Sequence, residues 1–597
     1  MIKSIKKHLG LLAIFVISIT NAQEKKVIEK TKDTIIKTEV VNVVTSYVPK
    51  ITDAFKIKQK PVIKHTKETQ KKALEYQIFS VPVASTFIPK SGTMKKIKLS
   101  KRERLYPNYL SIGLGNNITP FLEAYMHQNE SYNSEFGAHL KFLLSIDPVE
   151  NTQLSSTFYN ANLNVFYAQQ ERYFNWKAGI KLARDKYNWY GLPENITFNQ
   201  ATLSNIEEEQ AYNSFKVFGN LNIDDSYLEK VNGAVSYFAD PLNSSEFLIE
   251  ADALFKFQLD RIHRELNDLH INTTASYLGT TFENGYDTQN QLKHSFLNLG
   301  VHPTYKFLVQ DLSIKLGAKA YLSLDLENKL NNFLIYPDVE VSYPIVHEFA
   351  NAFIGASGDL ENNSYQSLVT KNQYISPTQN LLRTNKKLIL FGGVRGKVDA
   401  QFSYNFKASY SDIENNSFFA LNQSKSDGTS NTGTNAFSLF GYEYGNSFNT
   451  QYDDIKLLSF FGEVAYNGVK NLTVGFNGEF NKFTLTNLQE AWNTPKMKAE
   501  VFGTYKTENW FAGANFFFVG ERKGKEHALL PTQTFNTINL DSYFDVNFNG
   551  GYHFNDSFSV FLNLNNVLNN SYQRFNNFNV QGFQAMGGLT WKFDSLF

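Results

Sequence analysis

Most of this chain alternates between apolar and polar residues with a period of two. In SYFDVNFNGGYHF the apolar positions fall on every second residue along most of the stretch: Phe544, Val546, Phe548, Tyr552 and Phe554. The same alternation follows in SFSVFLNLNNVL, and it also runs through NLTVGFNGEF and YNANLNVFYAQ. Side chains two residues apart point to the same face of a strand, so a period of two predicts β-strands with one apolar face.

The number of these segments decides between two β architectures. About 20 to 22 of them fill residues 105–597, a count in the range of large membrane barrels. Alternation alone also fits a soluble sandwich with one wet face. A membrane barrel is favoured because the polar face carries Asn, Ser, Gly and Thr as often as charge, and because aromatic residues crowd the segment ends. Closure also removes the edges of so long a sheet. We therefore predict an all-β, antiparallel transmembrane barrel.

The connections between segments sort by length. Asn555-Asp556 and residues 467–471 are tight, and are expected on the periplasmic side of such a barrel. Residues 190–210 and 421–435 are long and rich in polar residues, and are expected on the extracellular side.

The first 104 residues differ from the body in both pattern and charge. Lys3, Lys6 and Lys7 precede an apolar run from Leu11 to Thr20, which predicts a signal peptide over residues 1–22, cleaved after Ala22. Residues 23–104 carry 18 Lys and 2 Arg against 8 acidic residues, about +12, whereas residues 105–597 carry −14. Four prolines interrupt this basic tail, which predicts an extended segment, either periplasmic or threaded through the acidic lumen.

Catalytic chemistry finds little support in the residues. Cys is absent, the 11 His residues are scattered, and no GxSxG, HExxH or P-loop spacing occurs. The sequence therefore predicts no enzyme, cofactor or metal site, and no nucleic-acid partner. Two segments remain open. Residues 186–193 fit an aromatic girdle or a ligand platform, and Arg522, Lys523 and Lys525 fit a strand leaving the bilayer or an anion site.

The end of the chain resembles known outer-membrane proteins. The segment 582–597 is similar to the signal that barrel-assembly machinery reads, with Gly588, Trp591 and Phe593 at the key positions. Residues 540–593 resemble the end of a TonB-dependent receptor barrel, whose motif NLxNxxY matches Asn566, Asn569 and Tyr572, with Val567 replacing Leu. Residues 374–397 are similar to the Pro-x-x-x-Leu entry of a strand in the middle of that barrel. The Ala22-Gln23 junction resembles the Bacteroidota branch.

The resemblance implies a partner for the N-terminal tail. In that family a short valine-rich segment, the TonB box, pairs with the energy-transducing protein TonB by strand addition. The matching segment here is TEVVNVVT: Thr38, Glu39, Val40, Val41, Asn42, Val43, Val44 and Thr45. The family also has a plug domain after its box, whereas Tyr47–Arg104 supplies only 58 Lys-rich residues, too few for an independent core. Inward loops, the tail or a partner protein would then have to occlude the lumen.

Two functions follow from these observations. The first is transport of a solute or polymer across the outer membrane, as the resemblance implies, with outer-membrane lipid and TonB as partners. The second is a structural or accessory subunit of an envelope complex for secretion, uptake or barrel assembly, in which the basic tail docks a periplasmic protein.

Overall fold

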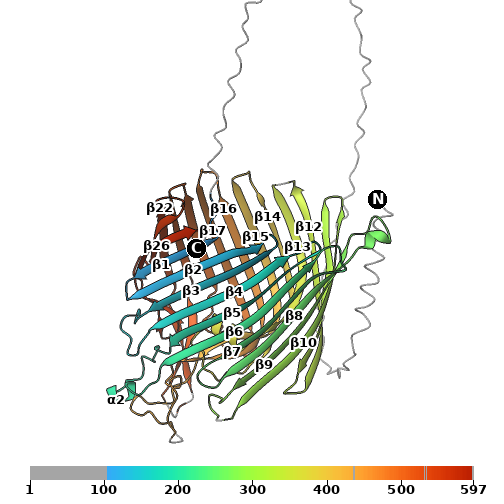
Figure 1. Cartoon of the computed structure of the whole chain (residues 1–597). Helices are drawn as coiled ribbons and strands as arrows, with labels where there is room; N and C mark the ends of the chain where they lie inside the picture. The colour runs from blue at the N-terminus through green and yellow to red at the C-terminus, as the bar shows by residue number, and fades with distance from the viewer. Residues whose placement is uncertain are drawn as a thin grey trace, which may run out of the picture. The chain divides into compact units, whose positions relative to one another are not determined.

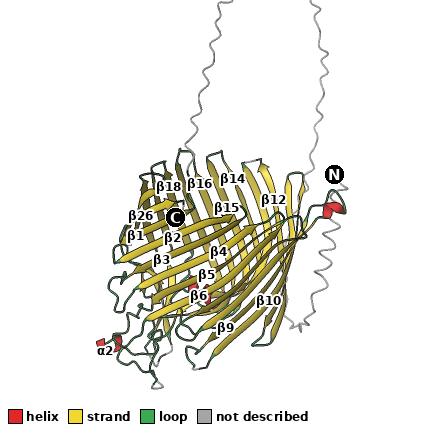
Figure 2. Ribbon diagram, viewed as in Figure 1, coloured by secondary structure: helices red, strands yellow, loops and turns green. Residues whose placement is uncertain are grey.

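The computed structural model describes residues 104–288, 290–347, 349–433, 437–529, 532 and 534–594. They form one closed antiparallel sheet of 22 strands, drawn in Figures 1 and 2. Each strand pairs with its neighbours along the chain, and the first strand pairs with the last. The barrel prediction is confirmed, and its strand count lies at the upper end of the predicted range. Residues 1–103, including the tail and the TonB-box-like segment, lie outside the described residues.

The first half of the barrel contains eleven strands. They are β1 (Asn108–Gly115), β2 (Thr119–Ser131), β3 (Ser134–Ser145), β4 (Phe158–Gln170), β5 (Phe174–Asn188), β6 (Glu209–Ile223), β7 (Leu228–Ala239), β8 (Ser245–Phe257), β9 (Leu269–Phe282), β10 (Leu292–Val309) and β11 (Leu312–Asp325).

The second half completes the closed sheet. Its strands are β12 (Leu330–Val346), β13 (Ala350–Asn362), β14 (Arg383–Lys397), β15 (Phe402–Leu421), β16 (Phe448–Tyr466), β17 (Leu472–Leu485), β18 (Met497–Lys506), β19 (Trp510–Val519), β22 (Tyr543–His553), β23 (Phe558–Asn565) and β26 (Gln584–Phe593).

Four short strands and three short helices lie in the connections. They are the hairpins β20 (Arg522–His527) with β21 (Phe535–Leu540) and β24 (Gln573–Phe575) with β25 (Phe578–Asn579), the α-helices α2 (Gln200–Leu203) and α3 (Tyr365–Lys371), and the 3-10 helix η1 (Leu259–Arg261). Among the described residues, no helix combines the length and the apolar character needed to cross a membrane.

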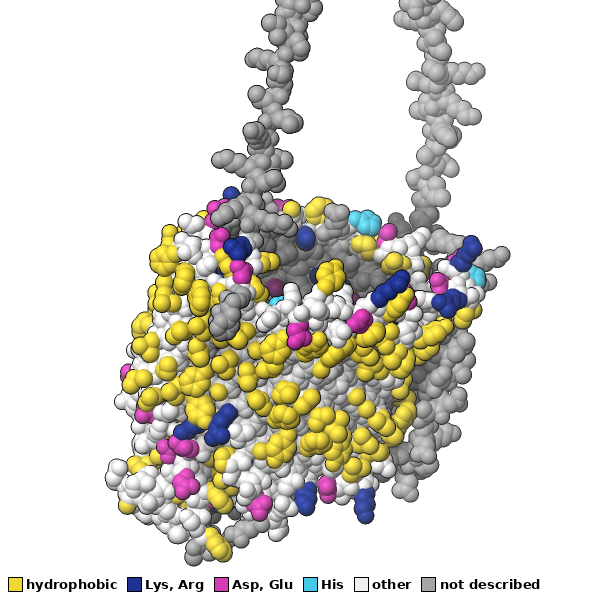
Figure 3. Space-filling view, viewed as in Figure 1, with side chains coloured by type: hydrophobic (Ala, Val, Ile, Leu, Met, Phe, Trp, Pro, Cys, Tyr) yellow, Lys and Arg dark blue, Asp and Glu magenta, His cyan; other side chains and the backbone are white. Residues whose placement is uncertain are grey.

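The outer face of the barrel carries the apolar side of the alternating pattern. Phe215, Phe406, Phe476, Phe516 and Phe548 are 42–51% exposed, although they are large apolar side chains. Figure 3 shows such side chains as a belt across the visible face, with charged side chains gathered toward the two rims. An exposed apolar belt between polar rims is the surface that a lipid bilayer covers.

The inner face is polar and contains ion pairs. Lys315 of β11 pairs with Asp338 of β12 at 2.6 Å, and Lys319 pairs with Asp359 of β13 at the same distance. Side chains of this kind face a polar lumen on the wall opposite to the lipid-facing belt.

Several phenylalanine rings of the inner face lie close to glycines of the neighbouring strand. A Cβ on Gly137 of β3 would come within 2.3 Å of the Phe166 ring of β4. At the closing seam, a Cβ on Gly588 of β26 would meet the Phe561 ring of β23 at 2.3 Å. Because glycine has no side chain, it leaves room for the neighbouring ring. The ring in turn covers the backbone of the glycine.

The two ends of the barrel differ in their connections. At the short-turn end, at the top of Figure 1, most connections are brief: 132–133, 171–173, 224–227, 258–268, 310–311, 347–349, 398–401, 467–471, 507–509 and 554–557. At the long-loop end the connections are 116–118, 146–157, 189–208, 240–244, 283–291, 326–329, 363–382, 422–447, 486–496, 520–542 and 566–583, and most of them are far longer. The tight and long connections predicted from the sequence therefore lie at opposite ends.

Candidate functional site

Five loops at the long-loop end pack against or hydrogen-bond to one another. We call them the loop layer: residues 189–208, 363–382, 422–447, 520–542 and 566–583. Tyr374 stacks on Phe578 with 3.9 Å between ring centroids. Tyr190 meets both rings edge-on, at 5.7 and 5.1 Å, and its hydroxyl donates to the carbonyl of Asn579 at 2.7 Å. Each buried aromatic ring removes a large apolar area from water, so one core stabilises loops that are far apart in the sequence.

The core of the loop layer rests on the inner wall of the barrel. Phe238 of β7, Leu278 and Phe282 of β9, and Phe296 of β10 are buried in the same apolar cluster as the loop aromatics. The helix α3 adds Tyr365 and other apolar residues to this cluster. The loop layer is therefore anchored to the inner wall and not only to the strand ends.

Two buried carboxylates hold α3 against that wall. Glu246 of β8 accepts hydrogen bonds from the backbone N–H groups of Tyr365 and Gln366 and, at 2.9 Å, from the Thr280 hydroxyl. Asp240 accepts a hydrogen bond from the Tyr365 hydroxyl at 2.7 Å. Burial raises the pKa of Asp240, while the bond from Tyr365 opposes that shift. Removing either carboxylate would leave buried donors of α3 unpaired.

Polar contacts join the loops as well. The Asn446 side-chain amide donates to the carbonyl of Trp189 at 2.7 Å, and the backbone N–H of Asn199 donates to the carbonyl of Gly428 at 3.0 Å. Gly428 has a φ of +93°, and a Cβ there would lie 2.3 Å from the carbonyl oxygen of Thr197. Only glycine fits this approach of two loops without strain.

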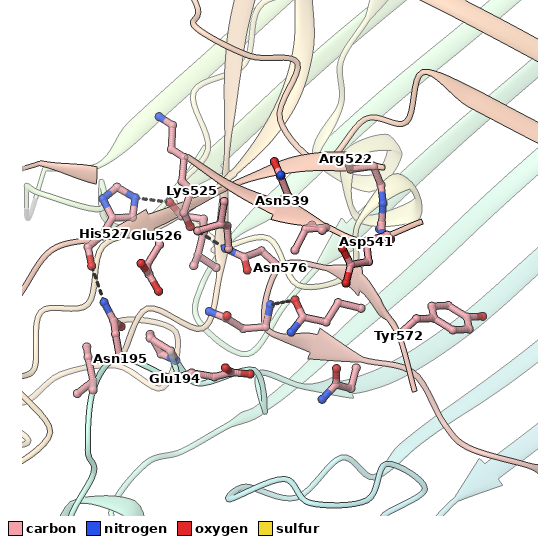
Figure 4. A pocket seen from close by; sticks show the side chains of 18 of the residues that line it. Glu194, Asn195, Arg522, Lys525, Glu526, His527, Asn539, Asp541, Tyr572 and Asn576 are labelled. Carbon is pink, nitrogen blue, oxygen red and sulfur yellow. Dashed lines mark hydrogen bonds between the residues drawn. The ribbon is translucent and has the colours of Figure 1, made fainter. Parts of the chain in front are cut away.

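A cavity of about 600 Å³ opens among four of these loops. Its walls come from residues 189–208, from 422–447, from the β20–β21 hairpin and from 566–583. Figure 4 shows it from close by, with Asn195, Asn539 and Asn576 among the amides around it. The volume is that of a small-molecule site, and the many amides offer both donors and acceptors to a polar ligand.

Arg522, at the start of β20, lines this cavity as a buried cation. It is 3% exposed, and its guanidinium donates to the carbonyls of Arg574 at 2.7 Å and Asp541 at 3.3 Å. Its Nε has no hydrogen-bond partner. None of the ion pairs among the described residues includes Arg522. Guanidinium stays protonated in proteins, so a full positive charge is buried here without a counter-ion.

Lys525 is a second buried cation on the same strand. This residue is only 6% exposed, and its Nζ donates to Gln451 at 3.1 Å and lies 4.9 and 4.4 Å from the ring centroids of Trp492 and Phe535. Burial lowers the pKa of Lys525. Lys525 also lines a neighbouring cavity of about 570 Å³, whose lining includes no carboxylate.

The three motif residues of the resemblance shape one loop of the cavity. Asn566 and Asn569 both adopt positive φ, +45° and +51°, a backbone region that asparagine tolerates better than most residues. The Asn566 amide donates to two carbonyls of the same loop, those of Asn570 and Gln581, at 2.8 and 2.9 Å. Tyr572 stacks on Tyr543 at 3.8 Å and donates to Asp545 at 2.8 Å. The motif therefore folds residues 566–583 onto β22.

The structure separates the basic residues that the sequence singled out. Lys523 pairs with Glu521 at 2.7 Å and is not part of the cavity lining, unlike Arg522 and Lys525. In the aromatic segment 186–193, Trp189 and Tyr190 are buried in the loop layer. The expectation of a girdle position was wrong for these two residues, because their strand ends before them and the chain turns inward.

The residues proposed as the insertion signal lie on the last strand. Gly588 pairs with Gly113 of β1, and Trp591 pairs with Leu110. Trp591 is exposed on the outer face and stacks on Phe558 at 6.1 Å, while Phe593 is buried. Their role in assembly stays a prediction. Thr38–Thr45 lie outside the described residues.

Sequence reasoning missed Asp240 and Glu246. In the sequence, Asp240 stands in the short connection between β7 and β8, where a carboxylate signals only a turn. Glu246 occupies a lumen-facing position of β8 like any other polar residue. Both carboxylates contact Tyr365 of α3, which comes much later in the sequence, and no local pattern reports such a contact.

A closed barrel of 22 strands with one elaborate end defines the fold class of large antiparallel β-barrels. No protein-family model and no curated protein sequence matches the chain. Solved structures do. The FpvA receptor of P. aeruginosa, in a structure with heterologous pyoverdines, is 12% identical, with a TM-score of 0.60, covering 83% of this chain and 72% of that one.

Two further structures show the same similarity. The FrpB iron transporter of Neisseria meningitidis is 11% identical, with a TM-score of 0.60 and 83% of both chains covered. The ferric-catecholate import receptor Fiu from E. coli K12 is 10% identical, with a TM-score of 0.57 and the same coverage. At these identities the similarity establishes the fold and leaves the function to be argued from the site.

Proposed function

We propose that this protein is an outer-membrane transporter that carries a solute or polymer through the barrel lumen. In this proposal the long-loop end faces the outside of the cell and the short-turn end faces the periplasm. The observation that carries it is the loop layer, which holds a polar cavity above a polar lumen inside an apolar belt. The similar folds named as receptors and iron transporters support the same function.

The N-terminal segment is proposed to couple transport to TonB. Thr38–Thr45 would lend main-chain donors and acceptors to a sheet edge of that partner. The basic tail 23–104 would reach the partner from the periplasmic end or thread the lumen, after cleavage of residues 1–22. This arrangement rests on the sequence and on the resemblance.

Photo-crosslinking in cells tests the coupling. A photo-reactive residue at Asn42 is expected to form an adduct with TonB, whereas the same residue at Lys71, in the tail but outside the valine-rich segment, is the control. Deletion of Gln23–Lys50 downstream of an intact signal peptide should abolish the adduct and leave the barrel in the outer-membrane fraction. A deletion that instead releases a stably bound periplasmic complex would contradict coupled transport and support an accessory subunit.

A further inference from the structure

The β20–β21 hairpin buries two positive charges: Arg522 at the cavity of the loop layer, and Lys525, whose Nζ contacts residues that line the neighbouring cavity. Arg522 and Lys525 are 3% and 6% exposed, and among the described residues neither forms an ion pair with a carboxylate. A buried charge is costly unless an opposite charge or several hydrogen bonds compensate it. Arg522 has two carbonyl acceptors and lies 5.1 Å from the centroid of the Tyr543 ring, and its Nε–H stays unpaired. An anion in the cavity would supply the opposite charge that Arg522 lacks.

The rest of the lining shows what else the ligand must carry. Glu194 and Asp541 line the cavity in solvent-exposed positions, and Glu526 is half-buried. Burial lowers the pKa of His527, while its contact with the carbonyl of Leu421, 2.8 Å from Nε2, opposes that shift. Positive charge is therefore buried, while negative charge is near water. Such an arrangement suits one anionic group held inside and a neutral or cationic polar body toward the opening.

The remaining polar groups fit such a body. Asn539, Asn576 and Asn579 line the cavity, and one amide, that of Asn576, leaves its side-chain oxygen without a partner. A side-chain amide can both donate hydrogen bonds to hydroxyl and amide groups and accept hydrogen bonds from them. We propose that this cavity binds a small solute with a single carboxylate or phosphate group, recognised by Arg522. The inference rests on the proposed transport function and names the chemical class of its ligand.

Binding to the purified full-length protein in detergent tests the site without any need for transport. The probes are glucuronate, its neutral counterpart glucose, and inorganic phosphate, measured by isothermal titration calorimetry at low ionic strength. Glucuronate is expected to bind on the order of tenfold more tightly than glucose, because its carboxylate accepts a charge-assisted hydrogen bond that glucose cannot form. Equal affinities for glucuronate and glucose would overturn the proposal.

The variants Arg522→Gln and Lys523→Gln form a matched pair on one strand. The change at Arg522 is expected to weaken glucuronate binding about tenfold and to leave glucose unchanged, since it removes the unpaired cation. The change at Lys523 should have a much smaller effect, because that ammonium pairs with Glu521 and does not line the cavity, which it touches only through its hydrogen bond to Asn539. Equal losses in both variants would overturn the proposal.

Arg522 also joins two loops, so its loss could disturb folding. The shift in electrophoretic mobility between unheated and boiled samples reports whether the barrel is intact. Arg522→Lys, which keeps the charge, is expected to retain more glucuronate binding than Arg522→Gln. Lys525→Gln is also expected to retain more than Arg522→Gln, because the Lys525 ammonium contacts residues of the neighbouring cavity. The assignment would be contradicted if all three variants bound glucuronate with the affinity of the wild type.

The anionic group could belong to a lipid as well as to a free solute. Micelles doped with lipid A separate the two sources. If the ligand is a soluble solute, inorganic phosphate and glucuronate are expected to compete with each other, and lipid A is expected to compete with neither. Displacement of glucuronate by lipid A alone would overturn the assignment to a soluble solute. Intact binding with no uptake in cells would contradict the transport function and leave the site standing.

Discussion

The two ends of the barrel are made from the same strands but stabilised by different means. At the short-turn end, each connection closes one hairpin and its contacts are mostly local, as in the turn at 554–557, where Asn555 accepts from the backbone of Ser557 and Phe558. At the long-loop end, four of the five long connections of the loop layer share an aromatic core of their own, and the fifth, 520–542, joins them through hydrogen bonds such as that from Asn195 to the carbonyl of His527.

This difference separates the frame of the protein from its recognition surface. Hairpin turns can change one at a time, because each is held by its own two strands. The loop layer depends on contacts such as that of Tyr374 with Phe578, between segments far apart in the sequence. A change in one loop therefore reaches the others, and the cavity with Arg522 depends on all of them.

The largest effect is expected from removing one loop of the layer. Replacing residues 424–445 by a short Gly-Ser linker should open the long-loop end, because a barrel of 22 strands has a wide lumen. Purified protein in planar lipid bilayers is then expected to conduct on the order of tenfold more than the wild type, while the same replacement at 467–471 changes little. Equal conductance of both variants would show that the loop layer is not a barrier.

The aromatic core of the layer should respond next. Tyr374→Ala removes a buried ring and is expected to cost about 3–5 kcal/mol of local stability. Hydrogen exchange followed by mass spectrometry should show faster exchange in residues 189–208 and 566–583, across loop boundaries. Tyr505→Ala is the control at the short-turn end, where its ring contacts only Trp510 among the aromatic residues described. Exchange confined to residues 363–382 would contradict a shared core.

A smaller effect is expected at the closing seam of the barrel. Gly588→Ala places a methyl group 2.3 Å from the Phe561 ring and 2.4 Å from the carbonyl oxygen of Ile112, a cost of about 1–3 kcal/mol. Gly503→Ala is the matched control, since no atom lies within 4 Å of its Cβ position. The temperature at which the unboiled gel band converts to the unfolded band measures both. A lower transition for the variant at Gly503 would argue against the role of ring packing.

The smallest effect is a pH dependence of the α3 anchor. The pKa of Asp240 is raised in the folded protein above its usual value. Its contribution to stability is therefore present at low pH and lost as pH rises through the folded pKa. The urea midpoint at pH 7, relative to that at pH 4, is therefore expected to be higher in Asp240→Asn than in the wild type. The two midpoints of each protein are measured by urea titration. An unchanged difference would mean that this carboxylate does not titrate with folding.

The barrel itself was predictable because the pattern that specifies each strand lies within a short stretch of sequence. Alternation places Phe544, Phe548 and Tyr552 on the lipid-facing side whatever the rest of the chain does, and all three are exposed apolar residues in the structure. Turn length separated residues 467–471 from 421–435 for the same reason. The NLxNxxY resemblance pointed to Asn566 and Asn569, which have the backbone conformation that local chemistry favours.

The site was only partly predictable, because residues that look alike in the sequence have different surroundings in the structure. Arg522 and Lys525 stand close to Glu521 in the sequence, yet the ion pair of Glu521 goes to Lys523 between them. Trp189 looked like a girdle residue because its neighbours are aromatic, and its burial depends on Tyr442, in a loop much later in the chain.

The sequence by itself determined the strands, their faces, the two classes of connection and the basic N-terminal segment, since each depends on the period or composition of a short stretch. Only the tertiary structure decided which loops meet, which carboxylates hold α3, and which cations are left buried without a partner. Those properties depend on distances between segments brought together by barrel closure, and no short stretch of sequence contains them.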